Sequence, residues 1–228
     1  YNIQHTSVPT GKDIMVTLEC IRPDMEIRYT TDGTEPDSGA SVYTEPVTLT
    51  ESTVLKAATF AGGKMMGKVL EIPVKWNKAT GKLTVNPKGN ERLLTNGVRG
   101  SLRQSDFEWC TWDNVKKSSF TIDLGQCEAI NSITLGSLTN YGMGVHKPKS
   151  ITVEASADGN KFISIGKRTY TDSEIFKEGN FIEDIKFEAK DINAQFIRIS
   201  CTGAGKNPVN HLRPGQQSRY YFDEIIIE

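Results

Sequence analysis

The chain lacks a long apolar run and lacks any strong excess of charge of one sign. None of its segments approaches the ~18 consecutive apolar residues that a membrane-spanning helix needs, so we expect no membrane span. The formal net charge of −1 over 228 residues gives no electrostatic reason to bind nucleic acid or an anionic membrane surface. Nucleic acid is therefore not expected as a partner.

Cysteine is scarce and scattered along the chain. The four cysteines form no Cys-x-x-Cys pair, which argues against a zinc site, and their spacing does not suggest a disulfide framework. We expect all four to be free: Cys20, Cys110, Cys127 and Cys201. The chain also begins at Tyr1 without an initiator methionine or a signal-peptide pattern, so we expect a piece of a longer protein.

Alternating apolar and polar residues fill the first third of the chain. In residues 13–20, Ile14, Val16, Leu18 and Cys20 fall on one side, which is the pattern of a half-buried strand. Further strands are expected at residues 25–31, 47–50, 53–60 and 64–76. Short strands at this spacing, without helical periodicity, indicate a small β-sandwich.

The polar run NKATG at residues 77–81 interrupts the strand pattern and marks a domain boundary. We therefore expect one domain over residues 1–77 and a second over residues 78–228. In the second, strands are expected at residues 118–124, 130–138, 150–155, 161–167, 181–189, 195–201 and 220–228. Seven or eight antiparallel strands in ~140 residues indicate a jelly-roll sandwich or barrel.

Two long loops, residues 139–149 and 202–219, interrupt the second domain, and loops of this length in a compact domain are usually functional. An earlier loop carries Trp109 and Trp112 between the Asn-Gly turn of residues 96–97 and the next expected strand. Large aromatic side chains on a loop beside a rigid strand are typical of a binding surface.

The first domain resembles the fibronectin-III-like domain near the C-terminus of chitobiases and β-N-acetylhexosaminidases. The motif YTTDGTEP at residues 29–36 carries this resemblance, which covers most of residues 8–76. In that family the domain is a spacer and packing module rather than a catalyst. The resemblance implies an immunoglobulin or fibronectin-III-like β-sandwich for this part of the chain.

The second domain resembles the coagulation-factor-5/8 type C, or discoidin-like, fold, which includes family 32 carbohydrate-binding modules. The similarity lies in LTNG at 94–97, IDLG at 122–125, the run 148–159 and FIRI at 196–199. It also resembles the C-terminal module of bacterial family 20 glycoside hydrolases. That comparison is carried by GVRGS at 97–101, Trp109 and Trp112, DLG at 123–125, HLRPG at 211–215 and FDEI at 222–225. The expected fold class is thus all-β, with a discoidin-like jelly roll after the smaller sandwich.

A sugar presents apolar C–H faces and a rim of hydroxyls, so a sugar site needs an aromatic platform beside fixed polar groups. We expect the platform among Trp109, Trp112, Tyr141 and Tyr220, and the hydroxyl contacts among Arg103, Asn140, His146 and His211. The alternatives are that the tryptophans close the end of the barrel and that the histidines are ordinary loop residues. In the loop 139–149, Met143 and Val145 stand where relatives carry an aromatic residue.

The resemblance also implies a structural calcium ion, because discoidin-like domains often bind one between an early loop and a late glutamate. Calcium takes six to eight oxygens, many of them backbone carbonyls. The matching positions are Asn96, Arg99 and Ser101, with Glu224 supplying charge. The alternative is a plain turn and an ordinary surface carboxylate.

The adjacent acids Asp223 and Glu224 do not predict catalysis. They lie on an expected strand, where neighbouring side chains point to opposite faces, and family 20 catalysis needs a (β/α)₈ barrel of about 250 residues. We expect a non-catalytic accessory region of a glycoside hydrolase, periplasmic, cell-surface or secreted. Its expected partners are a glycan with N-acetylhexosamine or galactose units and the catalytic domain of the same parent chain. The alternative is a structural module that binds no sugar and packs through exposed Met65, Met66 and Val145.

Overall fold

A computed structural model describes residues 2–228. The chain divides into two units: the first holds the residues up to Trp76 together with Asn96–Arg99, and the second holds Asn77–Thr95 and Gly100–Glu228. The sequence led us to expect a single boundary near residue 77. The short segment 96–99 instead joins the first unit, where Lys75 N–H donates to the Gly97 carbonyl at 2.7 Å.

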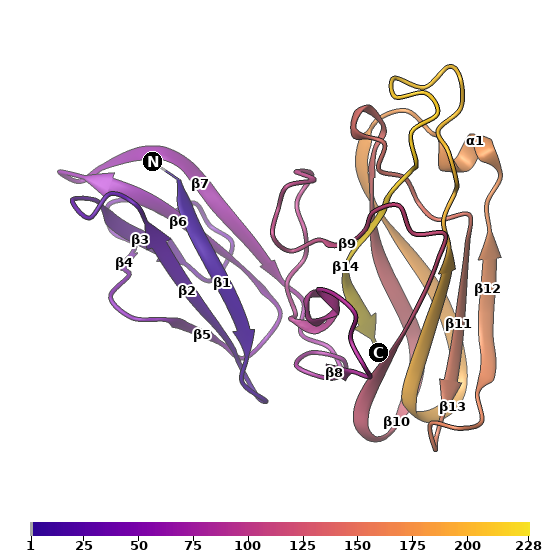
Figure 1. Cartoon of the computed structure of the whole chain (residues 1–228). Coiled ribbons are helices and arrows are strands. Elements are labelled where there is room, and N and C mark those ends of the chain that lie inside the picture. The colour runs from indigo at the N-terminus through magenta and orange to yellow at the C-terminus, as the bar shows by residue number, and fades with distance from the viewer. Residues whose placement is uncertain (1) are drawn as a thin grey trace. The chain divides into compact units, whose positions relative to one another are not determined.

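The first unit is a β-sandwich of two antiparallel sheets (Figure 1). One sheet has the order β1-β2-β5 and the other β4-β3-β6-β7. Their bounds are β1 Ile3–Pro9, β2 Ile14–Cys20, β3 Glu26–Thr30, β4 Ser41–Val42, β5 Val47–Leu49, β6 Thr53–Ala61 and β7 Lys64–Val74. Ile14, Val16 and Leu18 are buried against Leu55 and Ile72 of the facing sheet, as the alternation in the sequence predicts.

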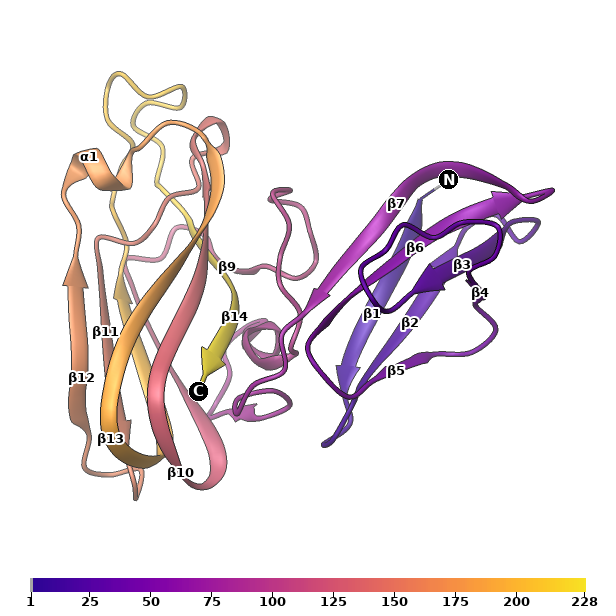
Figure 2. The ribbon, with the colours of Figure 1, turned by 180° about the vertical axis from the view of Figure 1, so that it is seen from behind.

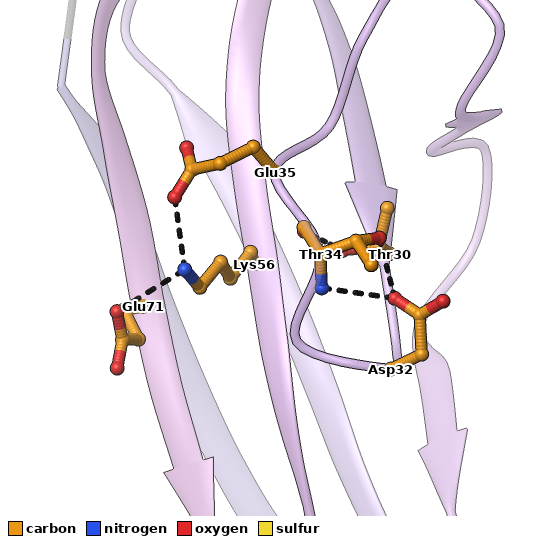
Figure 3. Close-up of polar contacts among 6 residues, drawn as sticks. All are labelled: Thr30, Asp32, Thr34, Glu35, Lys56 and Glu71. Carbon is orange, nitrogen blue, oxygen red and sulfur yellow. Dashed lines mark hydrogen bonds and ion pairs between the residues drawn. The ribbon is translucent and has the colours of Figure 1, made fainter.

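The motif of residues 29–36 builds the turn after β3 (Figure 3). Asp32 Oδ1 accepts hydrogen bonds from the Thr34 hydroxyl at 2.6 Å and the Thr34 N–H at 3.0 Å, which lowers the pKa of Asp32. Glu35 then pairs with Lys56 on β6 at 2.8 Å. The motif is therefore explained by turn chemistry, because a short acidic side chain satisfies backbone donors that the turn leaves open.

The second unit is a larger antiparallel β structure with the strand order β12-β11-β13-β10-β14-β9, in which β8 also pairs with β10 (Figure 2). Its strands are β8 Leu83–Thr84, β9 Cys110–Trp112, β10 Lys117–Asn140, β11 Ser150–Ser156, β12 Ile163–Thr169, β13 Asn180–Thr202 and β14 Tyr220–Ile227. Its short helices are η1 Glu91–Thr95, η2 Tyr141–Met143 and α1 Asp172–Ile175. None of the helices within the described residues is long and apolar enough to cross a membrane.

The two longest strands correct the sequence prediction. Residues 118–124 and 130–138 were expected as separate strands but form one bulged strand, β10, and β13 likewise joins the two strands expected at 181–189 and 195–201. The β10–β13 ladder shifts register between Asp123 and Glu128, so each strand bends and continues rather than ending. One apolar core lies along both halves of these strands.

Candidate functional site

The two long loops of the second unit are joined to each other by backbone hydrogen bonds. His146 N–H donates to the Arg219 carbonyl at 2.8 Å, and Arg219 N–H donates to the Gly144 carbonyl at 3.0 Å. The segment 203–219 and α1 lie at the same end of the unit in both ribbon views (Figures 1 and 2). The fold thus brings together two loops that are separated by more than 50 residues of the sequence.

Two predicted residues, His146 and His211, form a buried pair between these loops. Their Nε2 atoms lie 3.1 Å apart, and His211 Nδ1 accepts a hydrogen bond from Arg213 N–H at 2.8 Å. Because His211 Nδ1 accepts, its Nε2 carries the proton and donates to His146 Nε2. Burial, with the neighbouring His211 as a second cause, lowers the pKa of His146 to about 4, and burial also lowers the pKa of His211. Both rings are therefore neutral near pH 7.

The ring of Tyr141 packs on this pair and keeps part of its surface open. Its centroid lies 4.2 Å from that of His211, while Phe176 contacts His146 at 5.0 Å between centroids. Both Tyr141 and Phe176 are half-buried. Of the four rings predicted as a sugar platform, Tyr141 is the one that retains exposed surface.

A cavity of about 390 Å³ opens beside the histidine pair, and we name it the loop-end pocket. It is lined by Asn114, Met143, Gly144, Asn207, Arg213, Gln216, Gln217 and Arg219. Four of these side chains are amides and two are guanidinium groups, so the wall offers hydrogen-bond donors and acceptors in several directions. A polar concave wall of this kind suits a ligand that is rich in hydroxyl groups.

Asn207 forms the buried part of this wall. Only 4% of the residue is exposed, its Nδ2 donates to the Arg213 carbonyl at 3.0 Å, and its Oδ1 is buried without a hydrogen-bond partner. Gly144, at a φ of 68°, lies so close that a Cβ there would sit 3.0 Å from Asn207 Nδ2. An unpaired buried acceptor costs about 1–3 kcal/mol, and a ligand donor reaches this one only if the Asn207 side chain turns toward the pocket.

Both arginines of the pocket contact uncharged groups of the loop 139–149, and Arg219 also has an acidic neighbour. Arg213 Nε donates to the Gly142 carbonyl at 2.9 Å and its Nη2 lies 3.3 Å from Met143 Sδ. Arg219 Nη2 donates to the Met143 carbonyl, and its Nε lies 3.7 Å from the Asp113 carboxylate. These contacts orient both guanidinium groups on fixed backbone.

The structure corrects the prediction that Trp112 and Tyr220 form a sugar platform. Trp112 is stacked between Phe120 and Tyr220, with ring centroids 5.5 Å and 5.4 Å away and interplanar angles of 19° and 11°. Both faces of the indole are therefore covered, and Tyr220 is itself buried. We call Trp112, Phe120 and Tyr220 the aromatic stack; it belongs to the core of the unit.

Trp109 is likewise a core residue, with only 2% of its surface exposed. It packs with Leu138, Val145 and Tyr221, and its Nε1–H donates to the Ser101 carbonyl at 3.0 Å. A Cβ on Gly100 would come within 2.5 Å of the indole, so the glycine is needed for this close approach. Val145, expected as exposed interface in the structural alternative, is fully buried in the same cluster, whereas Met65 is 44% exposed and Met66 is half-buried.

The remaining predicted polar residues lie near this end but do not line the pocket. Asn140 Oδ1 accepts a hydrogen bond from Met143 N–H at 3.2 Å and so caps η2. Arg103 is exposed. Its loop is joined to β13 by a hydrogen bond of 3.1 Å, which Asn180 Nδ2 donates to the Leu102 carbonyl. Neither contact assigns a ligand-binding role.

Sequence reasoning missed the residues that form the pocket wall. Asn207, Arg213 and Arg219 all lie in the loop 202–219, which was expected to be functional, but only its histidine was singled out. A composition signal was present, because this loop contains three Lys or Arg residues and no Asp or Glu. Sequence reasoning also missed a larger groove of about 660 Å³ on the same unit, lined partly by Lys88, Trp112 and Ser118.

The calcium prediction stays a prediction. Glu224 is fully buried and its Oε1 accepts a hydrogen bond from Asn77 Nδ2 at 3.0 Å, while Asn96 Oδ1 accepts one from Val98 N–H at 2.9 Å. Ser101 Oγ accepts a bond from Arg103 N–H at 3.3 Å, and Arg99 N–H donates to a backbone carbonyl. Across residues 2–228, no three His, Cys, Asp or Glu side chains gather as a metal-binding group.

Family models match both units. The model of the F5/8 type C domain matches residues 78–213, and that of the chitobiase/beta-hexosaminidase C-terminal domain matches residues 8–71. The first of these matches covers more than half of the 228 residues, so the chain belongs to the F5/8 type C domain family. The resemblance of the first unit to the chitobiase C-terminal domain is confirmed by the second match.

Solved structures with a similar fold include three modules. Chitosan-binding module 1 of a chitosanase/glucanase from Paenibacillus sp. IK-5 is 16% identical, with a TM-score of 0.41 over 67% of this chain and 98% of the module. The C-terminal domain of a chitobiase from Bacteroides fragilis is 20% identical, with a TM-score of 0.37 over 60% and 78%. CpGH89CBM32-6 from Clostridium perfringens is 17% identical, with a TM-score of 0.42 over 67% and 98%. No curated protein matches the chain.

Proposed function

We propose that the second unit is a non-catalytic carbohydrate-binding module and that the loop-end pocket is its binding site. The observation that carries this proposal is a polar pocket of about 390 Å³ held between two long loops of an F5/8 type C domain. The names of several similar modules, which include a chitosan-binding module, point in the same direction.

The proposed ligand is a glycan with N-acetylhexosamine or galactose units. The exposed amide of Gln216 and the half-buried amide of Gln217 offer donors and acceptors to sugar hydroxyls, and Tyr141 supplies a partly open ring nearby. A shallow site for one or two sugar units binds weakly, with a Kd of ~1 mM or ~4 kcal/mol. Such binding is useful through tethering, because a linked catalytic domain stays at high effective concentration beside the glycan.

The proposed parent is an exported glycoside hydrolase of the chitobiase or β-N-acetylhexosaminidase kind, periplasmic, cell-surface or secreted. The match of the first unit to a chitobiase/beta-hexosaminidase C-terminal domain supports this origin. The catalytic domain would belong to the same parent chain, and the present chain alone should not turn over an aryl N-acetylglucosaminide. Measurable turnover by the purified chain would contradict its non-catalytic role.

A titration with N-acetylglucosamine and galactose oligosaccharides tests the binding site. Arg213→Gln should weaken binding roughly tenfold, because a charge-assisted donor to the ligand contributes about 1.5–3 kcal/mol. The matched control is Arg168→Gln on β12, since Arg168 also donates to a backbone carbonyl but lies outside the pocket. Absence of binding to every sugar by the folded chain would favour the structural alternative, in which the module only packs against its parent.

A further inference from the structure

The two loops that form the pocket carry charge of one sign. Residues 139–149 and 202–219 together contain five Lys or Arg residues and no Asp or Glu, although the whole chain has a net charge of −1. The five are Lys147, Lys149, Lys206, Arg213 and Arg219. Lys147 is already paired with Glu183, so the charge available to a ligand lies chiefly with the two arginines of the pocket.

Two of these cations line the pocket, and the described lining residues include no carboxylate. Arg213 donates to a carbonyl and lies against a sulfur atom, and no ion pair within residues 2–228 involves it. Arg219 has one acidic neighbour, Asp113, at 3.7 Å from Nε, and the side chain of Asp113 is about half exposed. The charge of Arg213 is thus left for a ligand to balance.

We propose that the loop-end pocket selects acidic saccharides, in which a carboxylate or sulfate group lies against Arg213 and Arg219. This inference rests on the proposed carbohydrate-binding function and adds the chemical class of the ligand. A planar guanidinium group donates two parallel hydrogen bonds to a carboxylate or sulfate, which a neutral sugar does not match. A half-buried pocket also weakens screening by water and strengthens the attraction.

The rest of the wall favours a saccharide over a simple anion. Gln216 and Gln217 add amide donors and acceptors at the side of the pocket, where hydroxyl or N-acetyl groups of the same ligand would lie. A bare anion uses the two arginines only. A saccharide that carries one acidic group uses the arginines and the amides together.

Two probes of equal length separate the acidic requirement from sugar binding in general. Chitotetraose is a neutral oligomer of N-acetylglucosamine, and a hyaluronan tetrasaccharide alternates N-acetylglucosamine with a carboxylate-bearing sugar. A chondroitin sulfate tetrasaccharide adds sulfate, and sodium sulfate alone reports on the anion without sugar. We expect the hyaluronan tetrasaccharide to bind roughly tenfold more tightly than chitotetraose in low salt, with the difference shrinking as salt screens the charge.

Gln216 provides a charge test that leaves the arginines in place. Its side chain is exposed at the pocket, and its backbone carbonyl accepts a bond from Asn207 N–H at 2.8 Å, which a side-chain change preserves. Loss of the Gln216 amide affects both ligands, so the readout is the ratio of the affinity for the hyaluronan tetrasaccharide to that for chitotetraose. Gln216→Glu should lower this ratio roughly fivefold and Gln216→Lys should raise it. Ser164→Glu on β12, which is also exposed, is the matched control for net charge.

The outcomes distinguish the two proposals. Equal affinity for the neutral and acidic tetrasaccharides, or identical behaviour of the two Gln216 variants, would overturn the acidic preference and leave the carbohydrate-binding function standing. Binding of sodium sulfate as tight as that of the acidic tetrasaccharides would show an anion site rather than a saccharide site and would also overturn the inference. Failure of every saccharide to bind would remove the proposed function itself. A comparison of the hyaluronan and chondroitin sulfate probes then shows which acidic group the arginines prefer.

Discussion

The aromatic stack and the loop-end pocket both lie beside loops of the second unit, but the stack is buried in the core and the pocket is open to solvent. Trp112 is covered on both faces by parallel rings, whereas the pocket wall consists mainly of amides and guanidinium groups. Aromatic rings that stack on one another are buried, because each ring gains contact area and stacking energy. Polar side chains of long loops remain at the surface, since burial would require a partner for every polar group. The comparison therefore favours the polar loops for the proposed binding site.

Among the substitutions that test this comparison, Trp112→Ala should have the largest effect. The loss of a stacked, buried indole should lower the free energy of unfolding by about 3–5 kcal/mol, measured by urea denaturation. The affinity of the remaining folded protein for sugar should not change, because the ring is not in the pocket. A stable variant with lost binding would reverse the assignment and make Trp112 the platform.

A smaller loss is expected from Gly100→Ala. The new Cβ would lie 2.5 Å from the Trp109 ring, so the indole or the backbone must shift, at a cost of about 1–3 kcal/mol. Gly142→Ala in the loop 139–149 is the matched control, because the nearest atom to a Cβ there is 3.9 Å away. Thermal unfolding of the two variants compares them directly, and equal melting temperatures would contradict the close packing of Trp109.

The histidine pair makes the pocket loops sensitive to acid. Folding holds the pKa of His146 at about 4, below its ordinary value of 6.5, so the unfolded chain takes up a proton first as the pH falls. The contribution of the neutral pair to the free energy of unfolding is present above about pH 6.5 and is lost as the pH approaches 4. Between about pH 7.5 and about pH 5.5 the loss should come to about 1.4 kcal/mol for His146.

Denaturant unfolding at these two pH values, in the wild type and in a variant with His146→Gln and His211→Gln, isolates the contribution of the pair. Carboxylates titrate in both proteins and cancel in the difference. The variant should lose less stability on acidification than the wild type. An identical loss in both proteins would show that the pair is not held neutral by the fold.

The strand pattern predicted much of the core. Ile197, Ile199 and Cys201 are buried on one face of β13 as expected, and the hairpin at residues 158–159 joins β11 and β12. The edge strand β1 was not predicted from the sequence. It pairs on one side only and few of its residues are buried, so its alternation of apolar and polar residues is weak. Two expected strands form the single strand β10 because a bulge lets the strand continue. The bulge depends on the pairing with β13 rather than on the local sequence.

The site was harder to predict because burial in loops depends on long-range contacts. Trp109 and Tyr141 are both loop aromatics in the sequence, and contacts with Gly100, Leu138, Val145 and Tyr221 bury the first. Arg213 takes its place in the pocket through bonds to Gly142 and Met143, some 70 positions away. Loop length singled out the two loops that line the loop-end pocket, but residue type alone did not identify the residues of its wall.

The most direct test of the account is a residue-by-residue NMR titration of the chain with the hyaluronan tetrasaccharide. The largest amide shifts should fall on Gly144, Arg213, Gln216 and Gln217, with little change at Lys88, Thr111 or Ser119 of the larger groove. Shifts concentrated in that groove, or on the strands of the first unit, would contradict the claim that the paired loops hold the saccharide.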